Sequence, residues 1–497
     1  MRKHPHLYEV NARILLRRLS SKLGQYGRKA LRPYTLSTVP DEVWLDLVGK
    51  GLDLVWLMGA WQRSAAARHT ALSLPGLQKE YDKALPGWSD EDVGGSPYAV
   101  YDYSLDSSLG EKTELASLRA KLNSLGMGLI VDFVPNHLSL DHPWVYARPQ
   151  LFVPGSEEHL RQHPDWFFSP DGNTIIAHGR DPYFPPWTDT AQVNFFSAEM
   201  REALIDQLLA IAAVADGVRC DMSMLGLNSI FQQTWGETLQ ESDRRDVEFW
   251  DEAIGRVKAR YPSFAFIAEV YWGLDQNLQR VGFDFTYDKA LYDRLLSSGA
   301  SEVRSHLASG DLDHSRSVRF IENHDEPRAA AFGRGRSQAA AVVIATVPGL
   351  RFFHDGQLEG RQIKLPVQLV REPEEPPDLQ TIEFYRRLLA SVKGSAFHDG
   401  EWRLVDTIEA WQGNGSHHNL LVWSWSYGDS LELVVVNYSS EAAQGRLKLQ
   451  LPPGAASQVA LSDELNGVTY FRDADEIQSM GLYVALDPWG VHLFHML

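Results

Sequence analysis

MGLIVDFVPNH, residues 127–137, decides the fold class of this sequence. Its centre, residues 128–134, is apolar apart from one aspartate, which is typical of a strand covered on both faces of a parallel sheet. Directly before it, four leucines at spacings of three and four predict an amphipathic helix, and Gly126 falls where a left-handed C-cap would end that helix. The leucines are Leu115, Leu118, Leu122 and Leu125. A helix that leads into a buried strand is the repeating unit of a parallel α/β sheet.

The same alternation extends outward over most of the chain, to about residue 390. A second predicted helix begins at about Ser197, a plausible N-cap, and leads into the short run GVRCD at 217–221. Eight strand candidates lie near residues 7–14, 52–59, 128–134, 217–221, 265–270, 283–287, 318–322 and 349–353. Repeated βα units of this number predict strands arranged around one parallel sheet.

Two stretches break the alternation. Between His137 and about residue 192 there is no long periodic helix but a dense mixture of proline, glycine and aromatic residues, and a loop of this length inside a barrel is usually functional. From about Trp402 to the end, the pattern changes to alternation with a period of two, and LELVVVNY at 431–438 predicts a buried strand. The tail is therefore expected to form a separate all-β sandwich.

Length and charge exclude several classes of function. A chain of 497 residues suits a barrel with at least one accessory module. The formal net charge of -18 argues against a nucleic acid or an anionic membrane as a partner. Cys220 is the only cysteine, so no intrachain disulfide can form, and the apolar run at 339–350 is too short to span a membrane. The N-terminal stretch at 1–18 lacks the apolar core of a signal peptide, and we expect a cytoplasmic protein of unknown oligomeric state.

Four short motifs carry carboxylates among apolar or small residues: DFVPNH, GVRCD, FIAEV and ENHDEPR. The carboxylate of DFVPNH lies within a predicted strand, and those of the other three motifs lie at the end of one. Cleavage of a sugar acetal requires two or three carboxylates that converge on one bond, and the carboxyl ends of barrel strands meet at one face. Each stretch alone also fits a structural ion pair or a satisfied carboxylate. Four of them in sequence favour a site.

The four stretches, in their order and spacing, resemble those of the α-amylase family of retaining glycoside hydrolases. The resemblance covers essentially the whole chain. It implies an α/β fold, a (β/α)8 TIM barrel with a loop domain inserted after strand three and a C-terminal all-β sandwich. The expected catalytic barrel comprises residues 1–137 and 193–394, the inserted loop domain residues 138–192, and the sandwich residues 395–497.

The resemblance assigns a role to each of three carboxylates. Asp221 matches the nucleophile, oriented by Arg219, and Glu269 matches the general acid, whose apolar flanks should raise its pKa. Asp325 matches the residue that binds the ring hydroxyls and supports the oxocarbenium-like transition state. In a retaining enzyme the two reacting carboxyl groups lie about 5 to 5.5 Å apart.

Further residues match substrate-binding positions of the family. His137 and His324 match histidines that bind sugar hydroxyls, and Tyr98, four residues before Asp102, matches a tyrosine that stacks on the cleaved sugar. Core packing is an equal alternative for Tyr98, and a structural role is the commoner one for a single histidine. Asn136 matches a calcium ligand of many amylases, so calcium stays an open alternative, and no other cofactor is expected.

Departures from the family pattern bear on the substrate. Many starch-degrading members carry Lys and His after the nucleophile, but MSML follows Asp221 here. Arg328 gives the NHDxPR form found in members that act on oligosaccharides. His354, Asp355 and Gln357, after the eighth strand, are candidates to line the pocket.

We therefore expect hydrolysis of α-glucosidic bonds in short α-gluco-oligosaccharides through a covalent glycosyl-enzyme intermediate. Two alternatives remain open: a transglycosylase or isomerase that uses the same carboxylates, and a non-catalytic binding or scaffold member of the fold.

Overall fold

The computed structural model describes residues 2–25, 34–239, 244–451 and 457–496. Eight parallel strands close a barrel in the order β1-β14-β13-β12-β11-β10-β5-β2, which confirms the predicted fold class. The strands are β1 (His6–Asn11), β2 (Leu54–Met58), β5 (Gly128–Phe133), β10 (Gly217–Cys220), β11 (Ala265–Ala268), β12 (Phe285–Tyr287), β13 (Ser317–Arg319) and β14 (Leu350–His354). Each overlaps one of the eight runs predicted from the sequence, although β13 shares only residues 318 and 319 with its run.

Several predicted strands extend beyond the ends of the observed strands. The first strand was expected to reach residue 14, but β1 ends at Asn11, and the helix α1 (Ala12–Gln25) follows at once. The Asn11 side chain accepts hydrogen bonds from the backbone N–H groups of Arg13 (3.1 Å) and Ile14 (3.3 Å), as an N-cap residue does, so it ends the strand and starts the helix. Strands β10 and β11 likewise end one residue before Asp221 and Glu269, which leaves both carboxylates at the carboxyl rim.

Helices surround the barrel, and two match the sequence prediction closely. Helix α5 (Glu114–Ser124) buries Leu115, Leu118 and Leu122, and Gly126 follows it with a φ of 84°. Helix α8 (Ala198–Ala212) is capped by Ser197, whose side chain accepts from Met200 N at 3.3 Å. The other helices around the barrel are α2 (Asp41–Gly49), α9 (Asn228–Trp235), α10 (Phe249–Arg260), α11 (Asp275–Arg280), α12 (Lys289–Ser297), α13 (Ala300–Leu307), α14 (Arg334–Thr346) and α15 (Leu379–Val392). Within the described ranges, no helix is long and apolar enough to cross a membrane.

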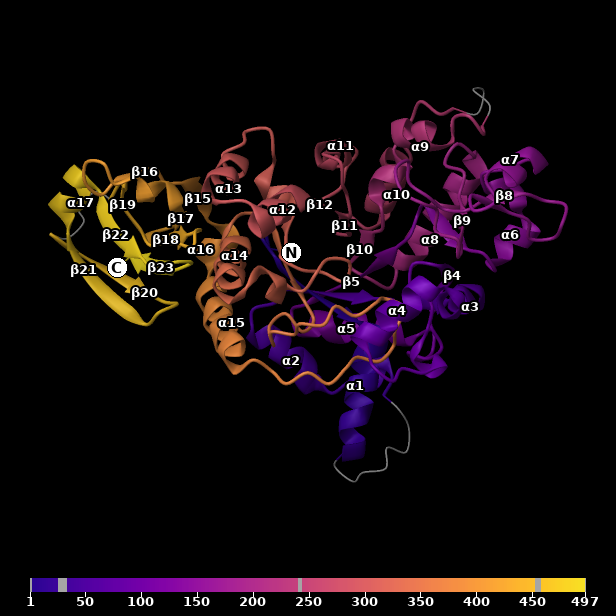
Figure 1. Cartoon of the computed structure of the whole chain (residues 1–497), viewed down its shortest axis with the longest axis horizontal. Coiled ribbons are helices and arrows are strands. Elements are labelled where there is room, and N and C mark those ends of the chain that lie inside the picture. The colour runs from indigo at the N-terminus through magenta and orange to yellow at the C-terminus, as the bar shows by residue number, and fades with distance from the viewer. Residues whose placement is uncertain (1, 26–33, 240–243, 452–456, 497) are drawn as a thin grey trace.

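Two excursions rise from the carboxyl ends of the strands. After β2, the chain forms β3 (Trp61–Arg63), α3 (Ala65–Ser73), α4 (Pro75–Ala84) and β4 (Val100–Leu105). After β5, it forms β6 (His137–Ser139), α6 (Pro143–Ala147), α7 (Glu157–Gln162), β7 (Phe167–Phe168), β8 (Ile176–Ala177) and β9 (Thr190–Gln192). Strand β6 pairs antiparallel with β9, so this excursion returns to its own root. Its short elements lie at the right end of the molecule in Figure 1.

The C-terminal strands form two sheets at the opposite end of the molecule (Figure 1). A six-stranded sheet has the order β15-β17-β18-β23-β20-β21, and a three-stranded sheet has the order β16-β19-β22. The strands are β15 (Glu401–Leu404), β16 (Thr407–Glu409), β17 (Leu420–Tyr427), β18 (Ser430–Asn437), β19 (Ala443–Leu447), β20 (Gln458–Asp463), β21 (Val468–Asp473), β22 (Leu482–Leu486) and β23 (Val491–Met496). These two sheets confirm the predicted C-terminal β domain, and a short helix, α17 (Ala474–Met480), follows β21, where the Asp473 side chain caps it.

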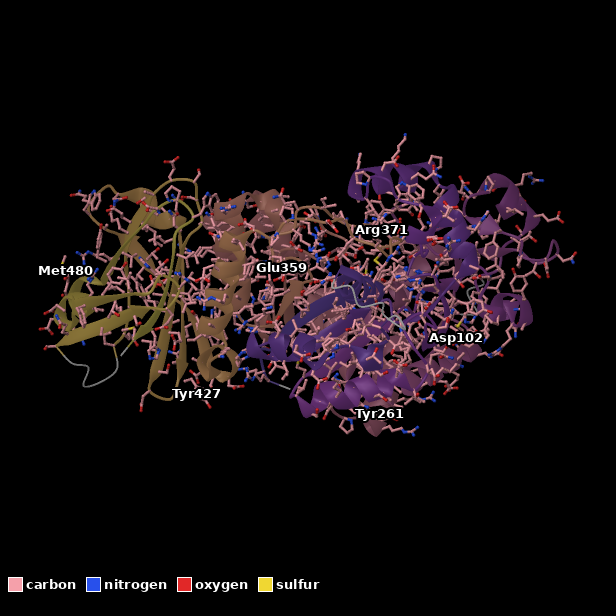
Figure 2. The ribbon with its side chains drawn as sticks, turned by 90° about the horizontal axis from the view of Figure 1, so that it is seen from below. Asp102, Tyr261, Glu359, Arg371, Tyr427 and Met480 are labelled. Atoms are coloured by element: carbon pink, nitrogen blue, oxygen red, sulfur yellow. The ribbon has the colours of Figure 1, made fainter. Side chains whose placement is uncertain are left out.

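An irregular segment, residues 361–376, connects the end of β14 with α15; we call it the cover segment. It passes across the barrel from α15 toward α4 in Figure 1, and Figure 2 shows Arg371 in the middle of the long molecule, far from Tyr427 and Met480 of the C-terminal sheets. Arg371 Nη2 lies 2.7 Å from Asp92 Oδ2. Glu372 accepts from Arg18 at 2.6 Å. These ion pairs fix the segment over the carboxyl end of the barrel.

Candidate active site

Three carboxylates from three strand ends gather around one guanidinium, that of Arg219 on β10. Arg219 Nη1 donates to Asp221 Oδ1 at 2.7 Å. Its Nη2 lies 2.8 Å from Glu269 Oε2, an ion-pair distance without hydrogen-bond geometry, and 4.0 Å from Asp325 Oδ2. The Arg219 side chain is 1% exposed. A buried cation at this position holds the three predicted catalytic carboxylates in one site.

Backbone hydrogen bonds between neighbouring strands set the positions of two of these carboxylates. Asp221 N donates to Phe133 O at 2.8 Å, and Glu269 N donates to Cys220 O at 3.0 Å. Hydrogen bonds between neighbouring strands therefore continue one residue past the ends of β10 and β11 and hold the two carboxylates side by side. Rigid elements of this kind hold reacting groups more accurately than loops can.

Glu269 is surrounded by donors but is buried, and burial dominates its chemistry. Met222 N donates to Glu269 Oε2 at 2.7 Å, and the Tyr271 hydroxyl donates to Oε1 at 2.8 Å. Burial raises the pKa of Glu269 to about 7, although Arg219 opposes the shift. A carboxyl group with this pKa is half protonated near neutral pH, as a group that both gives and takes a proton requires.

The other two carboxylates have opposite surroundings. Burial raises the pKa of Asp221, against the effect of its hydrogen bond with Arg219. Burial also acts on Asp325, but His324 and Arg219 outweigh it and lower the pKa of Asp325. The Asp325 side chain is 43% exposed and faces the mouth of the barrel. Carboxylates with pKa values driven apart in one site are typical of acid and base pairs.

His324 and Tyr98 lie together beside Asp325. His324 Nε2 is 2.9 Å from Asp325 Oδ2 and 2.8 Å from the Tyr98 hydroxyl. The Tyr98 ring stacks on the His324 ring at 5.4 Å, and the guanidinium of Arg219 lies 5.3 Å from the centre of the Tyr98 ring. Tyr98 is half-buried, so one part of it packs while another reaches the mouth.

His137 lies at the root of the loop excursion, beside the backbone of Tyr98. It is buried, its ring packs against Trp187 at 5.1 Å, and burial lowers its pKa to about 4. Its neighbour Asn136 was the calcium candidate. Asn136 O, Asn136 Oδ1 and Val193 O all lie within 2.9 to 3.2 Å of one amide nitrogen, Gln192 Nε2. Because an amide donor lies where these oxygens converge, the arrangement does not fit a cation.

The Arg328 guanidinium forms hydrogen bonds with other groups of the protein. Its Nη1 donates to Glu322 Oε1 at 2.7 Å and to Asp355 O at 2.8 Å, and it lies 3.0 Å from His354 Nδ1. The predicted pocket residue Gln357 donates to the Tyr385 hydroxyl at 2.9 Å. Arg328, His354 and Asp355 do line a small cavity of about 50 Å³, together with His324 and Lys364 of the cover segment.

A larger cavity of about 570 Å³ opens on the Glu269 side. Met222, Tyr271 and Trp272 line it beside the site, and Phe184 of the loop excursion lines it from the other direction. Met222 has a φ of 42° and Trp272 a φ of 62°, and strain at two bulky residues that flank the carboxylates is typical of functional sites. The Trp272 ring also meets Tyr183 edge to face at 4.8 Å.

Sequence reasoning missed several parts of this site. The Tyr287 hydroxyl lies 3.4 Å from Arg219 Nε, and Glu9 Oε1 lies 2.6 Å from His324 Nδ1. Glu9 left one signal in the sequence, as the only charged residue in the strand HLYEVN. Gln192 left none, because its role depends on the return of a loop whose path the sequence does not specify.

Comparison with known proteins shows the family to which the chain belongs. Residues 89–374, more than half of the chain, match the family model described as alpha amylase, catalytic domain. The alpha-amylase MalA of Haloarcula japonica is 26% identical over 277 residues, which are 53% of this chain and 36% of that protein. The alpha-1,4-glucan:maltose-1-phosphate maltosyltransferase of Rhodospirillum rubrum is 24% identical over 400 residues, 75% of this chain and 51% of that protein.

The chain thus spans about a third to a half of the length of these curated relatives. Among solved structures, the noncanonic maltogenic alpha-amylase AmyB from Thermotoga neapolitana superposes with a TM-score of 0.66 at 19% identity. That alignment covers 100% of this chain and 99% of the other, and it shows a shared fold. With a matching catalytic-domain model over more than half of its length, this chain belongs to the α-amylase family.

Proposed function

We propose that the chain is a retaining glycoside hydrolase that cleaves α-glucosidic bonds of short α-gluco-oligosaccharides. The observation that carries this proposal is the arrangement of Asp221, Glu269 and Asp325 around Arg219, with their pKa values shifted in different directions. A structural ion pair would need one carboxylate for one guanidinium.

In the proposed reaction, Asp221 attacks the anomeric carbon while Glu269 gives its proton to the leaving oxygen. Arg219 stabilises the ionised nucleophile through its 2.7 Å hydrogen bond. In the second step Glu269, now ionised, takes a proton from water, and the water oxygen displaces Asp221. Asp325, kept ionised by His324, faces the positive charge that develops on the sugar ring.

The preference for short substrates rests on how much space the site leaves on each side of the bond that is cleaved. The leaving group lies on the side of its proton donor, Glu269, and the sugar that is attacked lies on the side of Asp325, His324 and Tyr98. On that second side the cover segment leaves a cavity of only about 50 Å³, and Lys364 donates to the backbone carbonyl of Asp325. Such a cavity is too small for a further pyranose ring. We therefore propose removal of one sugar at a time from the chain end.

Product stereochemistry tests the proposal. Proton NMR of a fresh digest of an aryl α-glucoside, whose leaving group is not a sugar, should show α-glucose first and the β form only after mutarotation. First appearance of β-glucose would contradict the retaining mechanism. Attack within maltoheptaose before release of glucose would contradict action at the chain end.

A second candidate function is glycosyl transfer, and the cavity of about 570 Å³ favours it, because it could hold an acceptor sugar against Trp272. Product analysis with a labelled disaccharide separates the two. New linkages in excess of free glucose would favour transfer, and Trp272→Ala should then reduce transfer more than hydrolysis. Free sugar alone, in both proteins, would favour hydrolysis.

A further inference from the structure

Glu9 is a buried carboxylate whose position the reaction scheme above does not explain. It lies on β1, beside Trp56 of β2 and His354 of β14 in the strand register, and it is 1% exposed. Burial of a carboxylate is costly unless a charged or hydrogen-bonding partner compensates. Its Oε1 has such a partner, His324 Nδ1, at 2.6 Å. Among the residues that the structure describes, its Oε2 has no hydrogen-bond partner, and His354 Nε2 is 3.9 Å away.

His324 therefore connects two carboxylates. Nδ1 faces Glu9, and Nε2 faces Asp325 Oδ2 at 2.9 Å. Since a carboxylate can only accept, both contacts are satisfied together only when each ring nitrogen carries a proton. The ring is also fixed in orientation, stacked on Tyr98 and in edge contact with Trp56 at 5.5 Å.

The electrostatics agree with this geometry. Burial alone would lower the pKa of His324, but Asp325 and Glu9 outweigh burial and raise it well above its ordinary value. The ring is accordingly an imidazolium at neutral pH. The charged and titratable groups around it come from six elements or loops: Glu9, Tyr98, Asp132, Arg219, Asp221 and Asp325.

We propose that Glu9 is a positioning residue that holds His324 doubly protonated and aims its Nε2–H at Asp325 and at the sugar hydroxyls bound there. The contact of His324 with sugar hydroxyls rests on the proposed function. The effect of Glu9 on the protonation of His324 concerns the protein alone. Through His324, Glu9 keeps Asp325 ionised without touching the substrate.

Glu9→Gln tests the charge separately from the shape. Glutamine keeps the size and an acceptor oxygen for the Nδ1–H donor but removes the negative charge. In protein with isotope-labelled histidine, NMR titration follows His324, assigned as the resonance that is lost in His324→Gln. We expect the wild-type ring to stay charged above pH 7 and its pKa to fall by at least about one unit in Glu9→Gln.

Glu322→Gln is the matched control. Glu322 is also 1% exposed and lies beyond the end of β13, but it binds Arg328 and His354. Glu322→Gln should leave the pKa of His324 unchanged. If Glu9→Gln also leaves the pKa of His324 unchanged, the role of Glu9 is purely structural and the proposal is overturned. If Glu9→Gln does not fold, the wild type still decides, because a His324 that titrates at or below the ordinary value of about 6.5 also overturns it.

Activity gives a second measurement. In Glu9→Gln we expect kcat to fall about 10- to 100-fold, by analogy with the loss of a carboxylate behind a metal-ligating histidine. The alkaline limb of kcat/KM should become steeper, because His324 must then stay protonated as well as Glu269. An unaltered limb with unaltered kcat contradicts the role. If the wild type cleaves no α-glucoside, the proposed function fails, while the titration still tests Glu9.

Discussion

The two ends of the barrel each bury a guanidinium among ionisable groups, but the partners differ. At the carboxyl end, Arg219 is surrounded by Asp221, Glu269 and Asp325; we call this the upper cluster. At the amino end, Arg351 of β14 is surrounded by three histidines, His4, His6 and His398; we call this the lower cluster. One end therefore combines a cation with three carboxylates, and the other combines it with histidines and with one carboxylate, Asp53, whose Oδ2 lies 3.9 Å from His398 Nδ1.

The lower cluster is held by hydrogen bonds between its side chains and to backbone carbonyl groups. Arg351 Nη1 lies 3.2 Å from His6 Nε2, and Arg351 Nη2 donates to Phe397 O at 2.6 Å. His398 Nδ1 lies 2.7 Å from His4 O. Burial and Arg351 lower the pKa values of His4 and His398 to about 3, and burial lowers that of Arg351 to about 9.

The comparison teaches that a perturbed pKa alone does not identify an active site. Both clusters are buried and have shifted pKa values, yet the three carboxylates predicted to carry out acetal chemistry all lie in the upper cluster. The lower cluster joins β1 and β14 to the short helix α16 (Ser395–Asp399), before the C-terminal sheets. In barrels of this kind, the amino face serves stability and the carboxyl face serves chemistry.

The largest expected difference between the clusters is in activity. Asp221→Asn keeps the size of the side chain but removes the nucleophile, so kcat should fall by at least about 10⁴-fold. His398→Asn, whose amide can keep the hydrogen bond to His4 O, should leave kcat within about twofold. Steady-state kinetics on an aryl α-glucoside measures both. If kcat fell equally in the two variants, the idea that the carboxyl end serves chemistry and the amino end serves stability would be wrong.

Much of this division could be predicted from the sequence. The strands and the carboxylates at their ends were recognisable because apolar runs and strand-end acids are local patterns, as in GVRCD and FIAEV. The lower cluster was not predicted, because His6 and His398 are 392 positions apart and meet only through the closure of the barrel. Glu9 was missed for the same reason. The pKa values depend on burial, which a single sequence does not measure.

The second expected difference is in stability at acid pH. A histidine with a lowered pKa binds fewer protons when the protein is folded, so stability decreases as the pH falls below about 6.5 toward 3. With folded pKa values of about 3, we expect the free energy of unfolding to fall by roughly 2 kcal/mol for each of His4 and His398 between pH 7 and pH 5. Urea unfolding at the two pH values measures it. His398→Asn should lose less stability than the wild type; an equal loss would remove the lower cluster as the cause.

The smallest expected effect is the pH dependence of the upper cluster. Glu269 must be protonated to act as an acid, and its pKa is about 7. Above that pH, kcat/KM should fall about tenfold per pH unit. An activity independent of pH up to 9 on a substrate with a poor leaving group would contradict the role of Glu269. Substrates with an activated leaving group provide the control, since they need little proton donation.

The central claim, that Asp221 attacks the sugar, is tested most directly by trapping the covalent intermediate. A fluorinated α-glucosyl fluoride has a good leaving group, and its ring fluorine slows the second step. Mass spectrometry of the digested protein should find one fluoroglucosyl group on the peptide that contains Asp221 and none in Asp221→Asn. A label on another carboxylate, or equal labelling of Asp221→Asn, would contradict the account.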